Sequence, residues 1–178
     1  MKIITIIGGV AKDSINKKLF ELIMPLSPKE FEFDTFGIDS LPFFSQDIER
    51  NPPESVVQFK EKIINADGVL FITPEYNRSI PGVLKNAVDW VSRPYLNGAL
   101  VKKPVAVLGA ATGTIGTFGA QNDLRKILSS IGAAVMYQPE IYLHFYACVN
   151  DKGELADTTK KMYEKFLNSF REWILKNK

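Results

Sequence analysis

The sequence is poor in cysteine and histidine, the residue types that most often build disulfides, metal sites and acid–base pairs. It contains one cysteine, Cys148, and one histidine, His144. A single cysteine cannot form an internal disulfide or a CxxC metal or redox pair, and such low usage favours a cytoplasmic protein. His144 follows an expected strand and has no GxSxG serine to serve, which disfavours a serine–histidine hydrolase. We expect His144 to be a surface or interface residue and Cys148 to be a half-buried small side chain.

Long hydrophobic runs and blocks of like charge are also missing. The apolar run near the N-terminus covers only residues 3–7 before glycines and charges, which is too short for a signal peptide. No stretch approaches the roughly 20 apolar residues that a membrane helix needs. The 22 Lys and Arg and the 20 Asp and Glu are spread along the chain, with a formal net charge of +2. We therefore expect neither a membrane partner nor a nucleic-acid partner.

The remaining pattern is regular. Short apolar, β-branched runs alternate with segments of helical period, and the 178 residues suit one domain, residues 1–178. The expected strands are 2–7, 31–36, 68–73, 104–110 and 133–143. The expected helices are 14–24, 54–66, 81–92, 118–131 and 157–176. Such alternation predicts an α/β fold in which helices cover both faces of a parallel sheet.

Several residues mark the ends and faces of the expected helices. Ser14 is a candidate N-cap, Pro81 suits a first helical turn, and Gly132 suits a left-handed stop. The last helix carries apolar residues at three- and four-residue steps, which predicts a face buried in the core. This face comprises Met162, Phe166, Phe170, Trp173 and Ile174.

Ligands of open α/β sheets bind beyond the carboxyl ends of the strands. The loop after the first strand, GGVAKDSIN (8–16), joins glycines to a helix start, which favours an anion; the alternative is a glycine turn with an ordinary serine cap. It contains neither GK[ST] nor GxGxxG. The glycines of GAATGTIGTFGAQ (109–121) have the wrong spacing for NAD, and they either let backbone approach a flat ligand or form a flexible turn.

The loop after the third strand, TPEYNRSIPG (73–82), places an acid, a tyrosine and an asparagine between two prolines. A response-regulator domain would need acids after the first strand and an aspartate at the end of the third. Those positions hold glycines and Thr73-Pro74, which excludes that class.

Four segments give the chain a close resemblance to the NAD(P)H-dependent FMN reductase family, which includes quinone, azo-dye and chromate reductases. They are LPFFSQDIE (41–49), TPEYNRSIPGVLKNAVDWVSRP (73–94), GAATGTIGTFGAQNDLRKIL (109–128) and CVNDKGELAD (148–157). The resemblance implies a flavodoxin-like three-layer sandwich with a five-stranded parallel sheet in the order 2-1-3-4-5.

The resemblance also implies an FMN site at the three loops. Its residues would be Gly9, Lys12, Ser14, Ile15, Asn16, Pro74, Glu75, Tyr76, Asn77, Ala111, Thr112, Gly113, Thr114 and Gly116. The family's first loop usually reads G-S-x-R-x-x-S-x-N, whereas this chain has Gly9 and Ala11 in place of the serine and arginine. With Lys12 as a substitute cation, we expect weaker retention of FMN and no loss of the site.

The function implied is hydride transfer from NADPH or NADH, through bound FMN, to a small-molecule electron acceptor. The flavin carries the chemistry, so no catalytic side chain is expected. A flavodoxin-like one-electron carrier and a non-catalytic flavin-binding module are the alternatives. Arg78, at the mouth of the site, is either a solvated residue or a contact for a nucleotide phosphate.

The family resemblance further implies a homodimer with FMN near the subunit boundary, and tetramers in some relatives. Aromatic residues expected near that boundary are Phe43, Phe44, Trp90 and Tyr95, although Trp90 suits the core equally well. The tetramer contacts of some relatives use an aromatic at the position of Asn122, with Arg125 and Glu140. Because Asn122 is not aromatic, this set of tetramer contacts is incomplete, and only the dimer is predicted.

Overall fold

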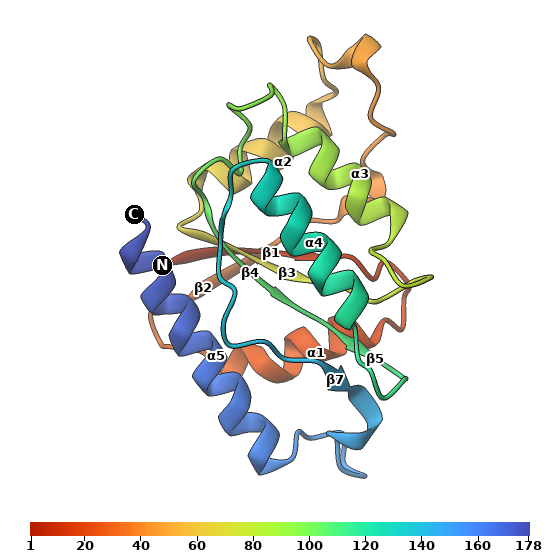
Figure 1. Cartoon of the computed structure of the whole chain (residues 1–178), viewed down its shortest axis with the longest axis vertical. Coiled ribbons are helices and arrows are strands. Elements are labelled where there is room, and N and C mark those ends of the chain that lie inside the picture. The colour runs from red at the N-terminus through yellow and green to blue at the C-terminus, as the bar shows by residue number, and fades with distance from the viewer.

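The structure is a computed structural model that describes all 178 residues. Its centre is a five-stranded parallel sheet in the order β2-β1-β3-β4-β6 (Figure 1). The strands are β1 (Lys2–Ile7), β2 (Glu32–Thr35), β3 (Gly68–Ile72), β4 (Pro104–Leu108) and β6 (Ala134–Val135). Since β6 is the fifth strand of this sheet, the predicted order 2-1-3-4-5 is confirmed.

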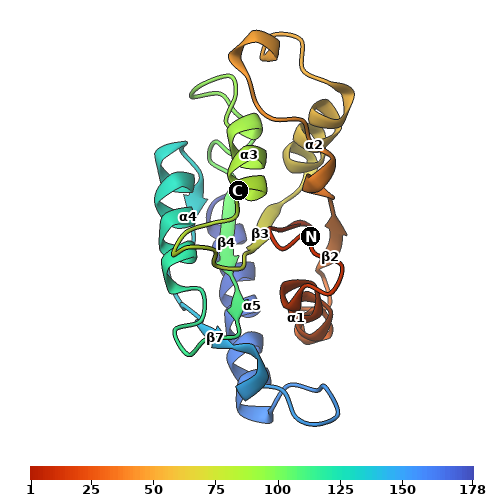
Figure 2. The ribbon, with the colours of Figure 1, turned by 90° about the vertical axis from the view of Figure 1, so that its right-hand side faces the viewer.

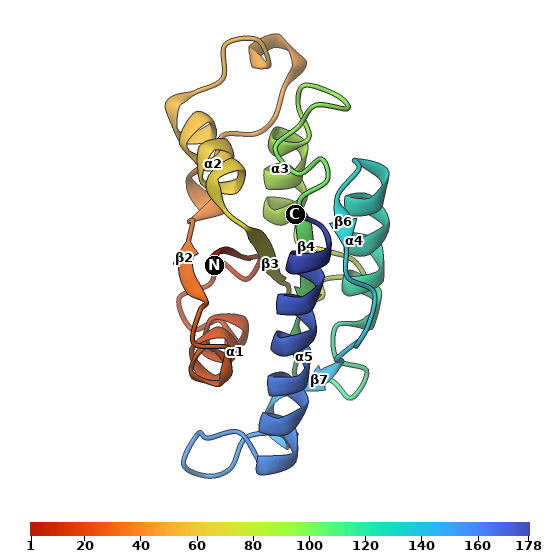
Figure 3. The ribbon, with the colours of Figure 1, turned by 90° about the vertical axis from the view of Figure 1, so that its left-hand side faces the viewer.

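Helices cover both faces of the sheet, which confirms the predicted three-layer sandwich (Figures 2 and 3). One face packs against α1 (Ile15–Ile23) and α5 (Asp157–Lys176). The other packs against α2 (Glu54–Asn65), α3 (Gly82–Val91) and α4 (Phe118–Ser130). Short 3₁₀ turns occupy Met24–Leu26, Ile38–Ser40, Gln46–Ile48 and Phe145–Ala147.

The central strands β3 and β4 are buried along their whole length, as their unbroken apolar sequences predict. Successive side chains point to opposite faces. Val69 and Phe71 join the core beneath α2 and α3, whereas Leu70 and Ile72 join the core beneath α1 and α5. Full burial of such a side chain stabilises the fold by about 1.5–3 kcal/mol, so these two layers fix the sheet between its helices.

The predicted helix ends are confirmed within a residue or two. Ser14 is the N-cap of α1, and its hydroxyl accepts a hydrogen bond from the backbone N–H of Asn16. Gly132 has φ +82° just beyond α4, a conformation that glycine adopts without strain. Pro81 lies at the N-cap of α3 and not within its first turn.

The predicted apolar face of α5 needs one correction. Phe166, Phe170 and Ile174 are buried as expected, and Trp173 is half-buried. Met162 is exposed and Tyr163 is buried in its place, so the buried face of the helix is shifted by one residue at this turn.

The last two strand predictions were too long. β4 ends at Leu108, and Ala110–Ala111 forms a separate short strand, β5. In the segment 133–143 only Ala134 and Val135 join the main sheet, and β7 (Leu143–His144) pairs with β5. Pro139 lies between these pieces and has no N–H to donate, so it cannot continue a ladder.

The connections position a potential site at one end of the sheet. The carboxyl ends of β1, β3 and β4 point toward β5 and β7 (Figure 1), while both chain termini lie at the opposite, amino end. The segment between β2 and α2, orange in Figure 1, projects from the body of the molecule. None of the helices combines the length and apolar character required to cross a membrane.

Candidate functional site

The three loops singled out in the sequence meet in one cleft at the carboxyl ends of β1, β3 and β4. The cleft has a volume of about 190 Å³. It is lined by Ala11, Ser14, Ile15, Asn16, Pro74, Glu75, Tyr76, Ala110, Ala111 and Thr112. Parallel strands that lie side by side bring these segments together, although up to a hundred residues separate them in the chain.

The loop after β1 offers unused hydrogen-bond donors. The backbone N–H groups of residues 9–13 donate no hydrogen bond within the chain. They lie just before the N-terminus of α1, whose first turn carries no acidic residue. A helix start with free N–H groups favours a negatively charged ligand such as a phosphate.

Gly9 makes room for the Ser14 hydroxyl in this loop. A Cβ atom on residue 9 would lie 2.3 Å from Ser14 Oγ, a distance that would force the serine to move. The absence of a side chain at position 9 therefore lets Ser14 occupy space that a serine at position 9 would need.

Asn16 fastens α1 to β5. Its side chain is fully buried, and Asn16 Nδ2 donates to the carbonyl of Ala110 at 3.0 Å while Asn16 Oδ1 accepts from the N–H of Ala110 at 2.9 Å. Because both the nitrogen and the oxygen of its side-chain amide bond to Ala110, Asn16 holds the start of α1 and β5, two walls of the cleft, together.

The loop after β3 contains a tight turn. Tyr76 and Ser79 exchange backbone hydrogen bonds, each of 3.0 Å. Between them, Asn77 has φ +51° and Arg78 has φ +66°. Positive φ at both central residues is the signature of a type I′ turn, which Asn tolerates and Arg rarely adopts. Tyr76 is thereby presented at the cleft with its side chain 53% exposed.

Glu75 links this loop to α4. Its side chain is 8% exposed, and Glu75 Oε2 accepts a hydrogen bond from the backbone N–H of Ala120 at 3.0 Å. The N-cap residue of α4, Thr117, makes no side-chain cap, so the carboxylate supplies one from another loop. It also lies at the positive end of the helix dipole.

Ser79 makes a second link to α4. Its hydroxyl donates to Asp123 Oδ2 at 2.7 Å. This hydrogen bond is the main reason that the pKa of Asp123 lies below its ordinary value, with a smaller contribution from Lys126. The two links make the loop after β3 and the first turns of α4 one unit.

The loop after β4 approaches its neighbours closely. A Cβ on Gly109 would lie 2.2 Å from the Thr73 carbonyl oxygen, so only glycine fits where β4 leaves the sheet beside β3. Gly116 has φ +65° and turns the chain toward α4. Between them, the backbone N–H groups of residues 112–114 donate no hydrogen bond within the chain and are free for a ligand.

The predicted site residues fall into two groups. Those that line the cleft are Ser14, Ile15, Asn16, Pro74, Glu75, Tyr76, Ala111 and Thr112. Those that do not line it are Gly9, Lys12, Asn77, Gly113, Thr114 and Gly116. Lys12 is exposed and forms no ion pair. Arg78 is 75% exposed and lies 3.4 Å from Glu75 Oε1, consistent with a largely solvated side chain.

Sequence reasoning missed three residues that support the site. The backbone of Ala110 is hydrogen-bonded to the Asn16 side chain, and the carboxylate of Asp123 accepts a hydrogen bond from Ser79. Lys17 Nζ donates to the carbonyl of Val10 at 3.3 Å. Only Lys17 could have been found, because it lies on the first turn of α1 next to the loop that it contacts.

The other predicted residues of interest are also placed. Cys148 is free and half-buried, as expected, and His144 is half-buried in β7. Trp90 is fully buried and belongs to the core. Phe43 and Tyr95 are 87% and 67% exposed.

The residues compared with a tetramer contact are engaged within the chain. Arg125 is 2% exposed, and its guanidinium donates to Gln121 Oε1 at 3.0 Å and lies 3.4 Å from Glu140 Oε1. Asn122 donates to the carbonyl of Phe118 in its own helix.

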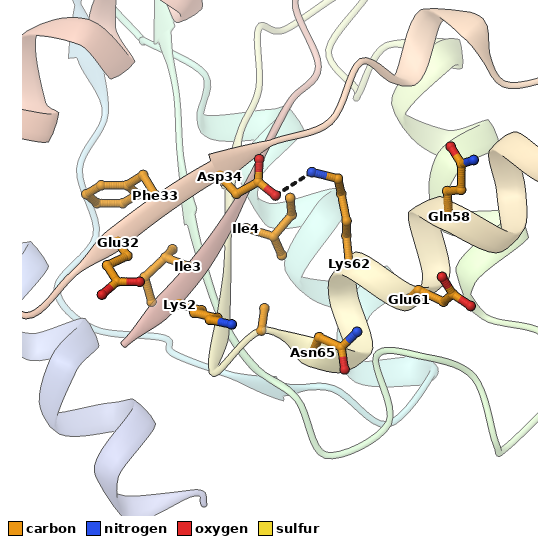
Figure 4. A pocket seen from close by; sticks show the side chains of 11 residues that line it. Lys2, Ile3, Ile4, Glu32, Phe33, Asp34, Gln58, Glu61, Lys62 and Asn65 are labelled. Carbon is orange, nitrogen blue, oxygen red and sulfur yellow. Dashed lines mark hydrogen bonds and ion pairs between the residues drawn. The ribbon is translucent and has the colours of Figure 1, made fainter.

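A larger hollow of about 540 Å³ lies between α2 and the amino-terminal halves of β1 and β2 (Figure 4). There Lys62 points from α2 toward Asp34 on β2 and pairs with it, which lowers the pKa of Asp34. This groove is away from the carboxyl ends of the strands, so its size alone does not make it the functional site.

The cleft suits a ligand that combines a phosphate with a flat ring, as FMN does. The free N–H groups of residues 9–13 suit the phosphate, and the free N–H groups of residues 112–114 suit the polar edge of a ring. The volume of about 190 Å³ is below the roughly 300–1,000 Å³ of typical ligand pockets.

The chain is similar to known reductases. Residues 1–147 match the family model described as NADPH-dependent FMN reductase. A 2-hydroxy-1,4-benzoquinone reductase from Burkholderia sp is 40% identical over 176 residues, covering 98% of this chain and 96% of that protein. A quinone reductase from Pseudomonas putida is 39% identical over 175 residues, covering 97% and 94% of the two chains.

A solved structure agrees with these sequence matches. It is the flavoenzyme NAD(P)H:(acceptor) oxidoreductase FerB from Paracoccus denitrificans, which superposes with a TM-score of 0.92 at 37% identity and covers 99% of this chain and 98% of that one. The likeness therefore extends over nearly the whole chain. This chain belongs to the NADPH-dependent FMN reductase family, whose members are oxidoreductases that use FMN and NAD(P)H.

Proposed function

We propose that this chain takes a hydride from NADPH or NADH and delivers reducing equivalents to a small-molecule acceptor of the quinone type, with FMN resident in the cleft. The observation that carries the proposal is the convergence of the three loops on one cleft with unused backbone donors on two sides. The quinone acceptor is inferred from the names of the similar enzymes. Bound FMN itself supplies the hydride chemistry.

In this proposal the chain's own residues bind FMN and orient its ring. Residues 9–13 and the start of α1 hold the phosphate, while Pro74, Glu75 and Tyr76 form one wall beside the ring. Glu75 keeps that wall against α4 through its hydrogen bond to Ala120. The free N–H groups of residues 112–114 provide dipoles that stabilise negative charge on the ring's polar edge.

The open side of the cleft is closed by a second subunit in this proposal. The segment between β2 and α2 projects outward (Figure 1), and Phe43 on it is 87% exposed, more than any other large apolar residue of the chain. A homodimer would cover it and enlarge the cleft. Light scattering of the purified protein should give twice the mass of 20.0 kDa, and a monomer would contradict this part.

Titration of apoprotein with FMN and with riboflavin tests the site. Because this loop lacks the arginine of related loops, we expect micromolar and not nanomolar FMN affinity, with riboflavin bound more weakly for want of a phosphate. Equal affinity for both flavins would reject the phosphate role of residues 9–13. A cytoplasmic location also belongs to the proposal and follows from the availability of NAD(P)H there.

A further inference from the structure

Another cavity shares no lining residue with the cofactor cleft and is lined by positive charge. Its volume is about 460 Å³, and it is bounded by the second half of α2 and by the loop that joins α3 to β4. In Figure 1 this loop is green and lies next to α2, at the end of the sheet away from β5 and β7. The charged residues that line it are Lys60, Arg93 and Lys103, and no carboxylate is among the lining residues.

Arg93 is held in place without using its donors. Its guanidinium carbon lies 5.2 Å from the centre of the Phe44 ring. That ring contacts Trp90 edge-on, and the backbone N–H of Phe44 donates to Asn86 Oδ1 at 2.8 Å. Arg93 Nε is buried and has no hydrogen-bond partner, and the side chain forms no ion pair. Arg93 Nε is thus a buried donor with no acceptor in the chain, and leaving such a donor unpaired is costly.

The two lysines add charge that the protein compensates only in part. Lys103 Nζ donates to the carbonyls of Ile64 and Ala66 at 3.0 and 2.6 Å, which fixes it at the C-terminus of α2. Lys60 forms neither a hydrogen bond nor an ion pair. Burial lowers the pKa of Lys60, and the charge of Glu49, which does not line the cavity, acts in the opposite direction. Burial also lowers the pKa of Lys103, and the charge of Asp67, which does not line the cavity, again acts in the opposite direction.

We propose that this cavity is an oxyanion site that binds a phosphate group, free or as part of an ester, on Lys60, Arg93 and Lys103. The guanidinium fork matches the geometry of phosphate oxygens, and the two ammonium groups supply charge for a dianion. The amide side chain of Asn97, which also lines the cavity, can donate to the same group. The proposal does not depend on the function assigned to the cofactor cleft.

The site can be located by NMR titration of the FMN-loaded protein with inorganic phosphate, against sodium chloride at matched ionic strength. We expect saturable shifts of the backbone amides of Lys60, Arg93 and Asn97, with the amides of residues 9–14 unchanged because FMN occupies that loop. Shifts confined to residues 9–14, or no saturation at any residue, would overturn the proposal.

Charge-removing variants give the quantitative test. Arg93→Gln and Lys60→Gln should each weaken phosphate binding about tenfold, the effect of losing one charge-assisted hydrogen bond. The control Lys29→Gln removes an exposed charge elsewhere and should leave the affinity unchanged. Equal effects of all three variants would show general charge attraction and contradict a built site.

Competition identifies the source of the phosphate. If NADP⁺ displaces inorganic phosphate and NAD⁺ does not, as seen from the shifts of the Lys60, Arg93 and Asn97 amides, the site binds the additional phosphate ester that distinguishes NADP⁺ from NAD⁺. If neither displaces it, the natural ligand is a free oxyanion or another phosphate ester. Either result keeps the oxyanion site, and displacement by sodium chloride alone would refute it.

Discussion

The carboxylate of Glu75 accepts a hydrogen bond from the backbone N–H of Ala120 at 3.0 Å, although 45 residues separate the two in the chain. The contact makes an acidic residue of the cleft wall the N-terminal cap of α4. Glu75 therefore orders the site by joining the loop after β3 to the helix after β4.

Replacing Glu75 should separate its capping role from its charge. Glu75→Ala removes the cap of α4 and should lower the free energy of unfolding by about 1–2 kcal/mol. Glu75→Gln keeps an oxygen that can accept from Ala120 and should lose less than half as much. Urea denaturation of the two variants measures both values, and an unaltered midpoint for Glu75→Ala would show that the cap is dispensable.

Removing the Asn16 side chain should loosen two walls of the cleft at once. Asn16→Ala leaves the buried N–H and carbonyl of Ala110 without partners, which predicts a loss of about 2–4 kcal/mol of stability. Asn122→Ala is the matched control, because Asn122 is exposed and its amide contacts only its own helix. Thermal unfolding measures the stability of both variants. A similar loss of stability in Asn16→Ala and Asn122→Ala would contradict the special role of Asn16.

A double-mutant cycle should reveal the relation between Gly9 and Ser14. Gly9→Ala places a methyl group 2.3 Å from Ser14 Oγ and should weaken FMN binding about tenfold by displacing that hydroxyl. In the Ser14→Ala background, where the hydroxyl is gone, the same change should have little effect. FMN affinities of the four proteins close the cycle, and additive effects would mean that the two positions act independently.

The Ser79–Asp123 hydrogen bond predicts a pH dependence of stability. Since the hydroxyl lowers the pKa of Asp123 in the folded state, the pair stabilises the protein above about pH 4, the pKa of an unperturbed aspartate. That contribution disappears as the pH falls through the lower folded-state pKa. Ser79→Ala should raise the pKa of Asp123 and flatten the acid side of the stability profile. NMR titration of the carboxyl carbon reads the pKa directly, and an identical titration in the variant would contradict the assignment.

The architecture could be predicted from the sequence because its causes are local. The unbroken apolar runs 68–72 and 104–108 specify strands buried on both faces, and Ser14 and Gly132 mark helix ends through their own side chain or backbone. The predicted fifth strand, 133–143, is too long because Pro139, which cannot donate to a sheet, interrupts the apolar run.

The site could be predicted only in part. The three loops were identified because the carboxyl ends of parallel strands share one edge, and eight of the fourteen predicted residues line the cleft. The partners of those residues could not be predicted, since Asn16 with Ala110 and Glu75 with Ala120 are pairs set by tertiary packing. No local sequence pattern reveals such pairs. Asn16 and Glu75, both expected to contact the cofactor, also hold the walls of the cleft in place.

Reduction of an acceptor by NAD(P)H in this cleft can be observed by anaerobic mixing of the FMN-loaded protein with NADPH and then with a quinone. We expect the visible flavin absorbance to bleach after the first addition and to return after the second. Absorbance that never bleaches with either NADPH or NADH would contradict the proposed function.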